Sequence, residues 1–358
     1  MEGVLGLLSL LLLLALWRAP RLARIRMQTP NLAPGFPGQV RLGQVAVEVW
    51  APLPLFFRLE NLPSAPLGLE PRSLSGMAWG KTRLALPLSC RYRRRGEHPL
   101  RLTLRFTSPL GLGERLLSLE AGRVLVYPAL RPLPPFEPAP SFFLEGKTEP
   151  FGLPDPLEAK GLRPYQPGDS LRLLAKRASL RQGRPFVREV EKSLLGSLFL
   201  HLDTQSLHPA YLDHGASLAA WLLLLAEKSG VPYSLSAGEV LPLGRGKGHL
   251  VRALSLLARL ESTRAPALPP KAPPGSTYFL ITQAAEQAFL KAALRGSVQA
   301  RHGVLLLLPE GYFLYPGEKG RLALGKTPGL ERALAMRGIL LAHGLELKVV
   351  RGHQPLTL

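Results

Sequence analysis

With 358 residues the chain exceeds the usual size of one domain, so two soluble domains are expected. A single cysteine excludes an intramolecular disulfide and a cysteine-based zinc cluster. The formal charge of +20 suggests a membrane surface or an acidic protein as neighbour, and no nucleic-acid partner is expected because no nucleic-acid motif accompanies the spread-out basic residues.

The chain begins with one apolar run. Gly3 to Trp17 contains fifteen residues without a charge, enough for a helix of about 22 Å against a hydrocarbon core of about 30 Å. Trp17 at the interface and a snorkelling Arg18 extend the effective span. We therefore predict a transmembrane anchor with a basic flank over residues 1–27.

The charges around this run predict its orientation. Four arginines follow it, so the positive-inside rule places the body in the cytoplasm and predicts a single-pass protein of the cell membrane: Arg18, Arg21, Arg24 and Arg26. A cleaved signal peptide is the alternative, although Glu2 precedes the run and Trp17-Arg18 follows it, which is the reverse of the usual charge pattern.

Residues 28–134 consist of short alternating strand-like runs separated by proline and glycine, among them QVAVEVW, LRLTLRFTS and RVLVYP. Such regularly spaced strands without helical periodicity are typical of a β-sandwich. Residues 135–157 are rich in proline and predict a semi-rigid linker.

Residues 196–358 have a different pattern, in which strand-like runs alternate with helical segments. Five strands and four helices are predicted, and this alternation favours βαβ units around a parallel sheet. The continuous apolar run GVLLLLP suits a strand that is buried on both faces.

The segment 158–195, between linker and α/β domain, is the most distinctive part of the sequence. Pro167-Gly168-Asp169 is a turn signal flanked by Arg163 and Arg172. An ion pair between Asp169 and one of these arginines would pin an extended segment to a sheet. A structural clasp is favoured over catalysis because no nucleophile or base accompanies the turn.

This segment resembles the bacterial family called domain of unknown function 58, whose R-x-Y-x-P-G-D-x-x-R run precedes an α/β domain of von Willebrand A type. The resemblance implies structural or docking roles, and partnership with a MoxR-type AAA+ ATPase. Two departures are visible: Lys176-Arg177 replaces a Trp-Lys pair, and one apolar helix is present instead of two. The matching residues are Arg163, Tyr165, Pro167, Gly168, Asp169, Arg172, Arg188, Glu189 and Glu191.

Domains of von Willebrand A type hold a divalent ion with a D-x-S-x-S turn after their first strand. Here Asp203 has the right position, but Gln205 and Leu207 replace the serines and Gln283 replaces a later aspartate. An amide is a weak ligand for a hard cation and leucine is none. We therefore expect a degenerate site without a cofactor, with Asp203 as a weak metal candidate and more typically a turn-forming or helix-capping carboxylate.

Three histidines near Asp203 raise the question of a zinc site: His201, His208 and His214. Their spacing matches no zinc motif, and we interpret them as surface histidines.

The expected fold class is thus multidomain: a transmembrane helix, a β-sandwich, and an α/β von Willebrand A-like domain with a Rossmann-type parallel sheet. The expected function is that of a non-catalytic membrane-anchored adaptor that works with the AAA+ ATPase through its C-terminal domain. Two alternatives remain open: a metal-dependent hydrolase or other enzyme that uses the Asp203 region, and a basic module that binds lipid or nucleic acid.

Overall fold

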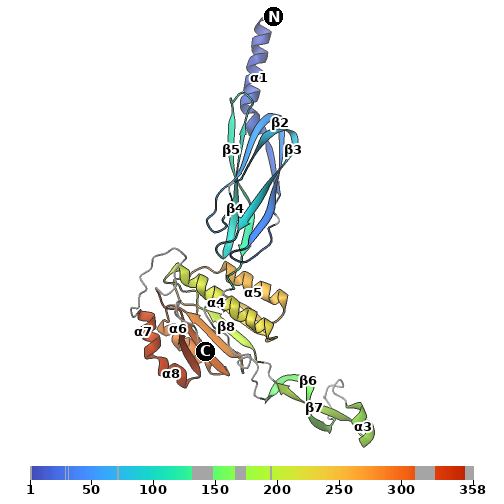
Figure 1. The fold of residues 1–358 in the computed structure, drawn as a ribbon, viewed down its shortest axis with the longest axis vertical. Helices are drawn as coiled ribbons and strands as arrows, with labels where there is room; N and C mark the ends of the chain where they lie inside the picture. Colours follow the sequence, from blue (N-terminus) through green and yellow to red (C-terminus); the bar gives the residue numbers. More distant parts are fainter. Residues whose placement is uncertain are drawn as a thin grey trace. The chain divides into compact units, whose positions relative to one another are not determined.

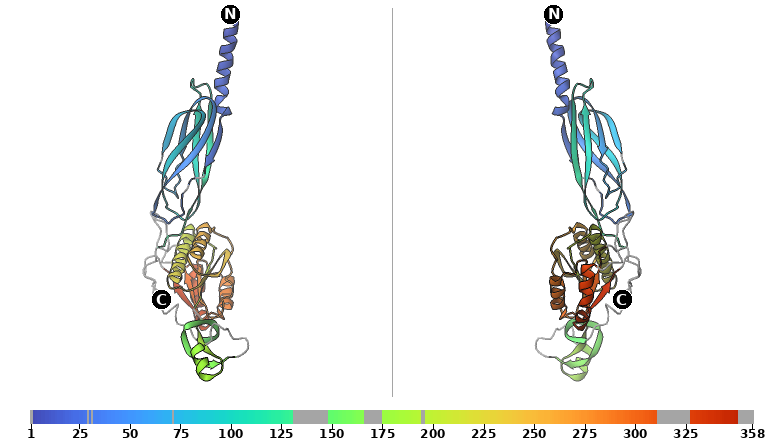
Figure 2. Two further views of the ribbon diagram at one scale, coloured as in Figure 1. Left: turned by 90° about the vertical axis from the view of Figure 1, so that its right-hand side faces the viewer. Right: turned by 90° about the vertical axis from the view of Figure 1, so that its left-hand side faces the viewer.

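The computed structural model describes residues 2–28, 30, 32–70, 72–130, 148–165, 175–193, 196–310 and 327–350. The chain divides into two compact units, shown in Figures 1 and 2. The N-terminal unit comprises residues 1–130 with 254–260, and the C-terminal unit comprises residues 131–253 and 261–358.

The N-terminal unit begins with helix α1, Glu2–Leu22, which is longer than the fifteen-residue apolar run. Its stretch Val4–Leu22 is long and apolar enough to cross a membrane, a property that signal sequences share. Leucines on all sides of its first turns are exposed, whereas Ala19 and the following Ala23 are buried in the core of the unit. The end of α1 is therefore part of the folded body.

Five antiparallel strands form the remainder of this unit: β1 Arg24–Gln28, β2 Val40–Asn61, β3 Ser73–Arg91, β4 Gly96–Thr107 and β5 Glu114–Val126. The long strand β2 pairs with β3 along almost its whole length. On its other edge it pairs first with β1, through residues 46–50, and then with β4, through residues 56–61.

The β2–β3 ribbon bends between Ala51 and Leu55, where its register shifts. A bulge of this kind breaks the ladder and bends the strand. Gly80, opposite Ala51, adopts the left-handed conformation with φ 61°. The bend closes the sheet over a shared apolar core that includes Leu55, Leu59 and Phe106, which gives the sandwich-like unit predicted from the strand pattern.

Cys90 lies inside this core. It is fully buried, and its thiol donates to the carbonyl oxygen of Leu67. Burial raises the pKa of the Cys90 thiol to about 11, so it remains protonated and unreactive near neutral pH.

The signature segment contributes a separate two-stranded antiparallel sheet, made of β6 Thr148–Pro164 and β7 Phe186–Ser193, with helix α3 Lys176–Gln182 between the strands. Strand β6 begins inside the stretch predicted as a linker. Its register places Arg163 opposite Val187 and Gly161 opposite Glu189.

A six-stranded sheet forms the centre of the C-terminal unit, in the order β10-β9-β8-β11-β12-β13. The sheet is parallel from β9 to β13, and the edge strand β10 runs antiparallel to β9. The strands are β8 Leu198–Leu202, β9 Tyr233–Ala237, β10 Glu239–Gly244, β11 Thr277–Thr282, β12 His302–Leu307 and β13 Leu345–Val349.

Helices cover both faces of this sheet (Figure 1). One face, with Tyr278 and Leu280, packs against residues of the last three helices, such as Phe289. Gly215 of α4 lies on the opposite face, against Leu202 and Ile281. The helices are α4 Pro209–Lys228, α5 Lys247–Arg259, α6 Gln287–Ser297, α7 Pro328–Ala335 and α8 Arg337–Ala342.

The predicted fold class is wrong in its last part, the von Willebrand A-like domain with a Rossmann-type parallel sheet. The sheet is mixed, because Gly238, with φ 74°, turns the chain directly from β9 into the antiparallel strand β10. Strand β10 is mostly exposed and lacks the apolar run that marks the buried strands, which is why the sequence did not reveal it. Much of the strand content lies outside this sheet, in the sandwich-like unit and in the β6–β7 pair.

Candidate functional site

Polar side chains gather where β8 and β11 end, beside each other, in the C-terminal unit. Asp203 follows β8 directly and Thr282 is the last residue of β11. Because parallel neighbours end at the same edge of a sheet, their loops meet there. We call this group the strand-end cluster; it consists of Asp203, Gln205, Thr282, Gln283 and Glu286.

Asp203 is the centre of the cluster and is fully buried. Its Oδ1 accepts hydrogen bonds from the backbone N–H groups of Gln205 and Ala267, both at 3.0 Å. Its Oδ2 accepts from the hydroxyl of Thr282 at 2.8 Å. The carboxyl group thus ties its own loop to the 263–267 loop and to the end of β11, and the bond from Gln205 makes an Asx-type turn.

Desolvation by burial raises the pKa of Asp203, and its three hydrogen bonds oppose that shift. The nearby Tyr211 hydroxyl donates to the Asp203 carbonyl oxygen at 2.9 Å, and burial raises the pKa of Tyr211 well above its usual value. Tyr211 therefore stays protonated and acts as a donor that fixes the turn, rather than as a base.

Gln205 stands where a metal-binding turn would supply a hydroxyl. Its Nε2 donates to the Glu286 carboxylate at 2.6 Å and to the Arg264 carbonyl oxygen at 3.0 Å. Glu286 is the residue before α6, and its side chain makes no capping bond to that helix. The amide thus holds the second carboxylate of the site, which leaves its own Oε1 buried with no hydrogen-bond partner among the described residues.

Gln283 stands where the later aspartate would be expected. Its Oε1 accepts from the backbone N–H groups of Leu207 at 2.9 Å and of His208 at 3.3 Å. His208 then caps α4, because its Nδ1 accepts from the Ala210 N–H at 3.1 Å. The Leu207 side chain remains exposed on a loop whose backbone is held in place.

His201 is buried, so its interpretation as a surface histidine was wrong. Its Nε2 donates to the Ala267 carbonyl oxygen at 2.7 Å and its Nδ1 accepts from the Ser236 hydroxyl at 3.0 Å. Desolvation lowers the pKa of His201 to about 4, so the ring is neutral at physiological pH. Strand alternation places His201 and Asp203 on the same side, and both bind the 263–267 loop at Ala267.

The chemistry available to this cluster is limited. Both oxygens of Asp203 already accept hydrogen bonds from the protein, and Gln205 donates to Glu286 rather than offering an oxygen. Within the described ranges no group of three or more histidine, cysteine or acidic side chains is arranged to hold a metal ion. The residues present therefore fit a structural clasp better than a divalent-cation site.

The signature residues lie apart from this cluster in the chain. Pro167, Gly168, Asp169 and Arg172 fall outside the described residues. Strand β6 carries Arg163, and β7 carries Arg188, Glu189 and Glu191. The N–H of Tyr165 donates to the Pro185 carbonyl oxygen at 2.9 Å, which extends the pairing of the two strands.

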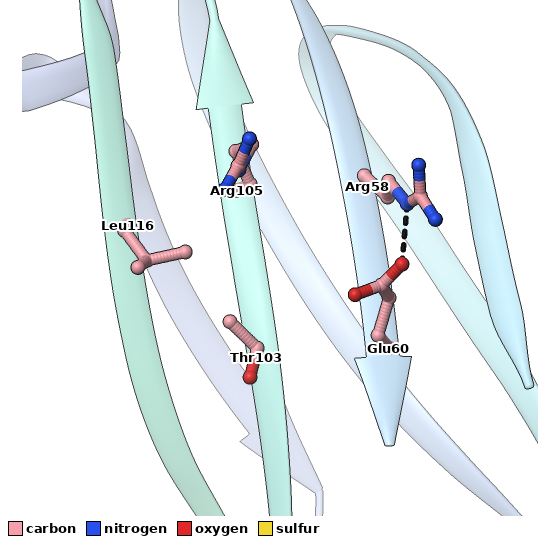
Figure 3. Close-up of a pocket in the computed structure, with 5 residues that line it drawn as sticks. All are labelled: Arg58, Glu60, Thr103, Arg105 and Leu116. Carbon is pink, nitrogen blue, oxygen red and sulfur yellow. Dashed lines mark hydrogen bonds and ion pairs between the residues drawn. The ribbon is translucent and has the colours of Figure 1, made fainter. Parts of the chain in front are cut away.

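A second polar site lies on the outer face of the sandwich (Figure 3). Arg58 pairs with Glu60 on the same strand, and Arg105 pairs with Glu114 at 3.1 Å. Thr103 and Leu116 complete its lining. Its arginines are mostly exposed and pair with carboxylates at the surface, so the site offers basic charge without a catalytic arrangement.

Sequence reasoning found Asp203, Gln205, Leu207 and Gln283 but missed their partners. These partners come from segments roughly 60 to 80 residues away, and only the tertiary fold brings them together. The Thr282 hydroxyl and the Ala267 N–H bind Asp203, and the Glu286 carboxylate binds Gln205. The apolar run before Thr282 is the one signal that could have placed it beside Asp203, since both follow buried strands.

No family model matches this chain, and no curated protein matches it. Among solved structures, the chain is similar to the ASH/PapD-like domain 7 of human CEP192, at 11% identity and a TM-score of 0.22, over 29% of this chain and 84% of that one. It is also similar to WR4, an MSP family member of C. elegans, at 12% identity and a TM-score of 0.18, over 26% of this chain and 99% of that one.

Proposed function

We propose that this chain is a non-catalytic, membrane-anchored adaptor that works with a MoxR-type AAA+ ATPase, with its body in the cytoplasm. The observation that carries the proposal is the strand-end cluster. Both oxygens of the buried Asp203 carboxylate accept hydrogen bonds, from two backbone N–H groups and from the Thr282 hydroxyl. The cluster therefore fixes the loops at the strand ends and offers no reactive group.

The end of α1 favours a retained anchor over a cleaved signal peptide. Ala19 and Ala23 are buried in the core of the N-terminal unit. The Arg115 guanidinium donates to the carbonyl oxygens of Arg21 and Ala23, at 3.1 and 3.0 Å. Cleavage directly after Trp17 would leave these residues in the chain, but it would cut α1 one turn before its end and remove the Trp17 carbonyl on which Gly113 packs. A signal peptide, in contrast, leaves a complete fold behind.

The distribution of charge supports a body on the cytoplasmic side of the membrane, with a membrane surface or an acidic protein as its neighbour. The arginines that follow the apolar run satisfy the positive-inside rule, and the whole chain carries +20. The signature segment resembles the family of unknown function 58, and this resemblance is the reason to name an AAA+ ATPase of MoxR type as the partner.

Leu207 is the proposed contact at the strand ends. Its side chain is exposed while its backbone N–H is held by Gln283, so it presents an apolar group on a rigid support. An exposed apolar side chain on a preorganised loop loses little entropy when it is buried by a partner. The signature residues, Asp169 and Arg172 among them, belong to the same proposal as further docking candidates.

The test is recovery of the ATPase with the full-length protein, purified from detergent-extracted membranes of its own host. We expect wild type to recover a MoxR-type AAA+ ATPase, and Leu207→Asp to lose most of it because a carboxylate would have to be desolvated in the interface. Leu42→Asp is the matched control, since Leu42 is also an exposed leucine but lies in the N-terminal unit. Equal recovery with all three proteins would contradict docking through the strand ends, and no ATPase with wild type would contradict the adaptor itself.

A further inference from the structure

Six of the exposed large apolar side chains of the N-terminal unit lie at one end of the sandwich, around the point where α1 enters it. We call this group the apolar rim; it consists of Trp17, Trp50, Phe56, Met77, Trp79 and Leu110, and all six side chains are exposed. Three of the four tryptophans of the chain belong to it. Isolated exposed apolar residues are ordinary, but a contiguous group with this composition marks a binding surface.

Strand register shows that the rim is one place in the fold. Trp50 lies opposite Arg24, two residues after α1 ends, and Phe56 lies opposite both Met77 and Thr107. The bend of the β2–β3 ribbon between Ala51 and Leu55 therefore faces the same end as the start of β1 and the β4–β5 turn. Trp79 sits in that bend, between the partners of Ala51 and Leu55.

The β4–β5 turn, which carries Leu110, packs directly on α1. A side chain at Gly113 would meet the Trp17 carbonyl oxygen at 2.3 Å, so only glycine allows this approach. Arg115, two residues further, binds the carbonyl oxygens at the end of the helix. The rim and the last turns of α1 thus form a single body.

Basic side chains follow the rim, on the side away from the apolar part of α1. Near Trp50, a shallow pocket of about 170 Å³ is lined by Arg24, Arg26 and Lys81, with Glu48 as its one carboxylate. The Arg24 guanidinium lies over the Trp50 ring at 5.6 Å. On the β2–β4 pair of the same sheet, Arg58 lies opposite Arg105, two residues beyond Phe56 and Thr107. An aromatic ring followed by a basic ring is the pattern of a membrane interface.

The length of α1 points the same way. From Glu2 to Trp17 the helix spans about 24 Å, which is short of a hydrocarbon core of about 30 Å. The remaining turn, with Ala19, is packed into the sandwich and cannot be lipid-exposed on that side. The difference between the length of the helix and the thickness of the hydrocarbon core is accommodated if the rim itself enters the bilayer interface.

We infer that the apolar rim docks into the surface of the same bilayer that α1 spans, with Trp50, Trp79 and Leu110 at the level of the acyl boundary and the basic pocket against anionic headgroups. The sandwich is then seated in the membrane surface rather than tethered above it. This inference rests on the proposed membrane anchor.

The test uses the full chain in nanodiscs of phosphatidylglycerol and phosphatidylcholine, with an environment-sensitive fluorophore on one introduced cysteine and a nitroxide on the lipid headgroups. Buried Cys90 stays unlabelled, and wild type provides the blank. We expect labels at Trp79→Cys and Leu110→Cys to be quenched several-fold more strongly than a label at Leu42→Cys. Leu42 is 80% exposed and lies nine positions along β2 from Ala51, where the bend begins.

Quenching at positions 79 and 110 no stronger than at position 42 would overturn the inference. Protection of the two labels without lipid quenching, increasing with protein concentration, would also overturn it, because a second copy of the chain would then cover the rim. Carbonate extraction of native membranes reads out the anchor separately. A chain that resists extraction but shows equal quenching at positions 79, 110 and 42 would support the membrane anchor and contradict docking of the rim. A chain that is extracted but shows stronger quenching at positions 79 and 110 would contradict the membrane anchor and support contact of the rim with lipid.

Discussion

Replacement of Asp203 by alanine is expected to destabilise the C-terminal unit by about 3–5 kcal/mol, because the buried donors of Gln205, Ala267 and Thr282 lose their acceptor together. The loss is large since these donors belong to two loops and to the end of β11, which would no longer be held together at one edge of the sheet. Asp203→Asn is the matched control. Its amide keeps an acceptor for the two N–H groups, and we expect a cost of about 1 kcal/mol.

The free energy of unfolding is measured by urea titration of the full chain in detergent, with the fluorescence of Trp221 in α4 as the probe. The other three tryptophans lie in the N-terminal unit, are exposed, and are replaced by phenylalanine in every protein compared. An alanine variant as stable as the asparagine variant would show that Asp203 does not hold the loops.

The stability of the C-terminal unit is expected to fall by about 2 kcal/mol between pH 7 and pH 5 because of His201. Burial lowers the folded-state pKa of this histidine from 6.5 to about 4. In that window the unfolded chain binds a proton that the folded chain does not, so acid favours unfolding. The contribution is complete above pH 6.5 and is lost as the pH falls toward 4.

His201→Gln removes the titrating group and keeps hydrogen-bonding capacity toward Ala267, so its stability should change little from pH 7 to pH 5. The same urea titration at several pH values compares the two proteins. Asp203, whose pKa is raised, contributes with the opposite sign, because its folded form takes up a proton more readily than the unfolded chain. A wild-type slope identical to that of His201→Gln would contradict a neutral buried histidine.

The sequence predicted the elements of this protein better than their assembly. The runs read as strands and helices in residues 196–358 correspond to β8, β9, β11, β12, β13 and to α4, α5 and α6, because buried parallel strands are continuously apolar and helices repeat every 3.6 residues. The described part of residues 196–358 has five helices where four were predicted, because the chain is divided at Met336 into α7 and α8.

Two features of the fold had no local signal. The bend of the β2–β3 ribbon joins runs that look like separate strands into β2, and depends on a register shift that only pairing creates. The antiparallel strand β10 is exposed and weakly patterned, and it follows a one-residue turn at Gly238. This second feature alone accounts for the mixed sheet that replaces the predicted parallel one.

In the candidate site, too, the sequence revealed the residues of one loop but not their tertiary contacts. Asp203 and the missing ligands at Gln205 and Leu207 were visible in the sequence, since they lie in one short loop. The roles of Gln205 and Gln283 were not, because each amide acts on a segment far away in the chain. Seen in the fold, the two glutamines stabilise the loops that a metal ion would otherwise hold.

The apolar rim could not have been read from sequence either. Trp17, Trp50 and Trp79 are separated by about thirty residues each, and no periodicity links them. Register alone brings Trp50 and the Trp79 bend to the end where α1 enters.

The most direct test of a structural, non-catalytic strand-end cluster is calorimetric titration of the full chain in detergent with Mg²⁺, Mn²⁺ and Zn²⁺, beside Asp203→Asn. We expect no saturable heat from either protein and no rise in the unfolding midpoint with metal, because Asp203 and Glu286 are already bound to protein donors. Saturable binding of one ion by wild type, abolished in Asp203→Asn, would contradict the structural role and favour a metal-dependent enzyme instead.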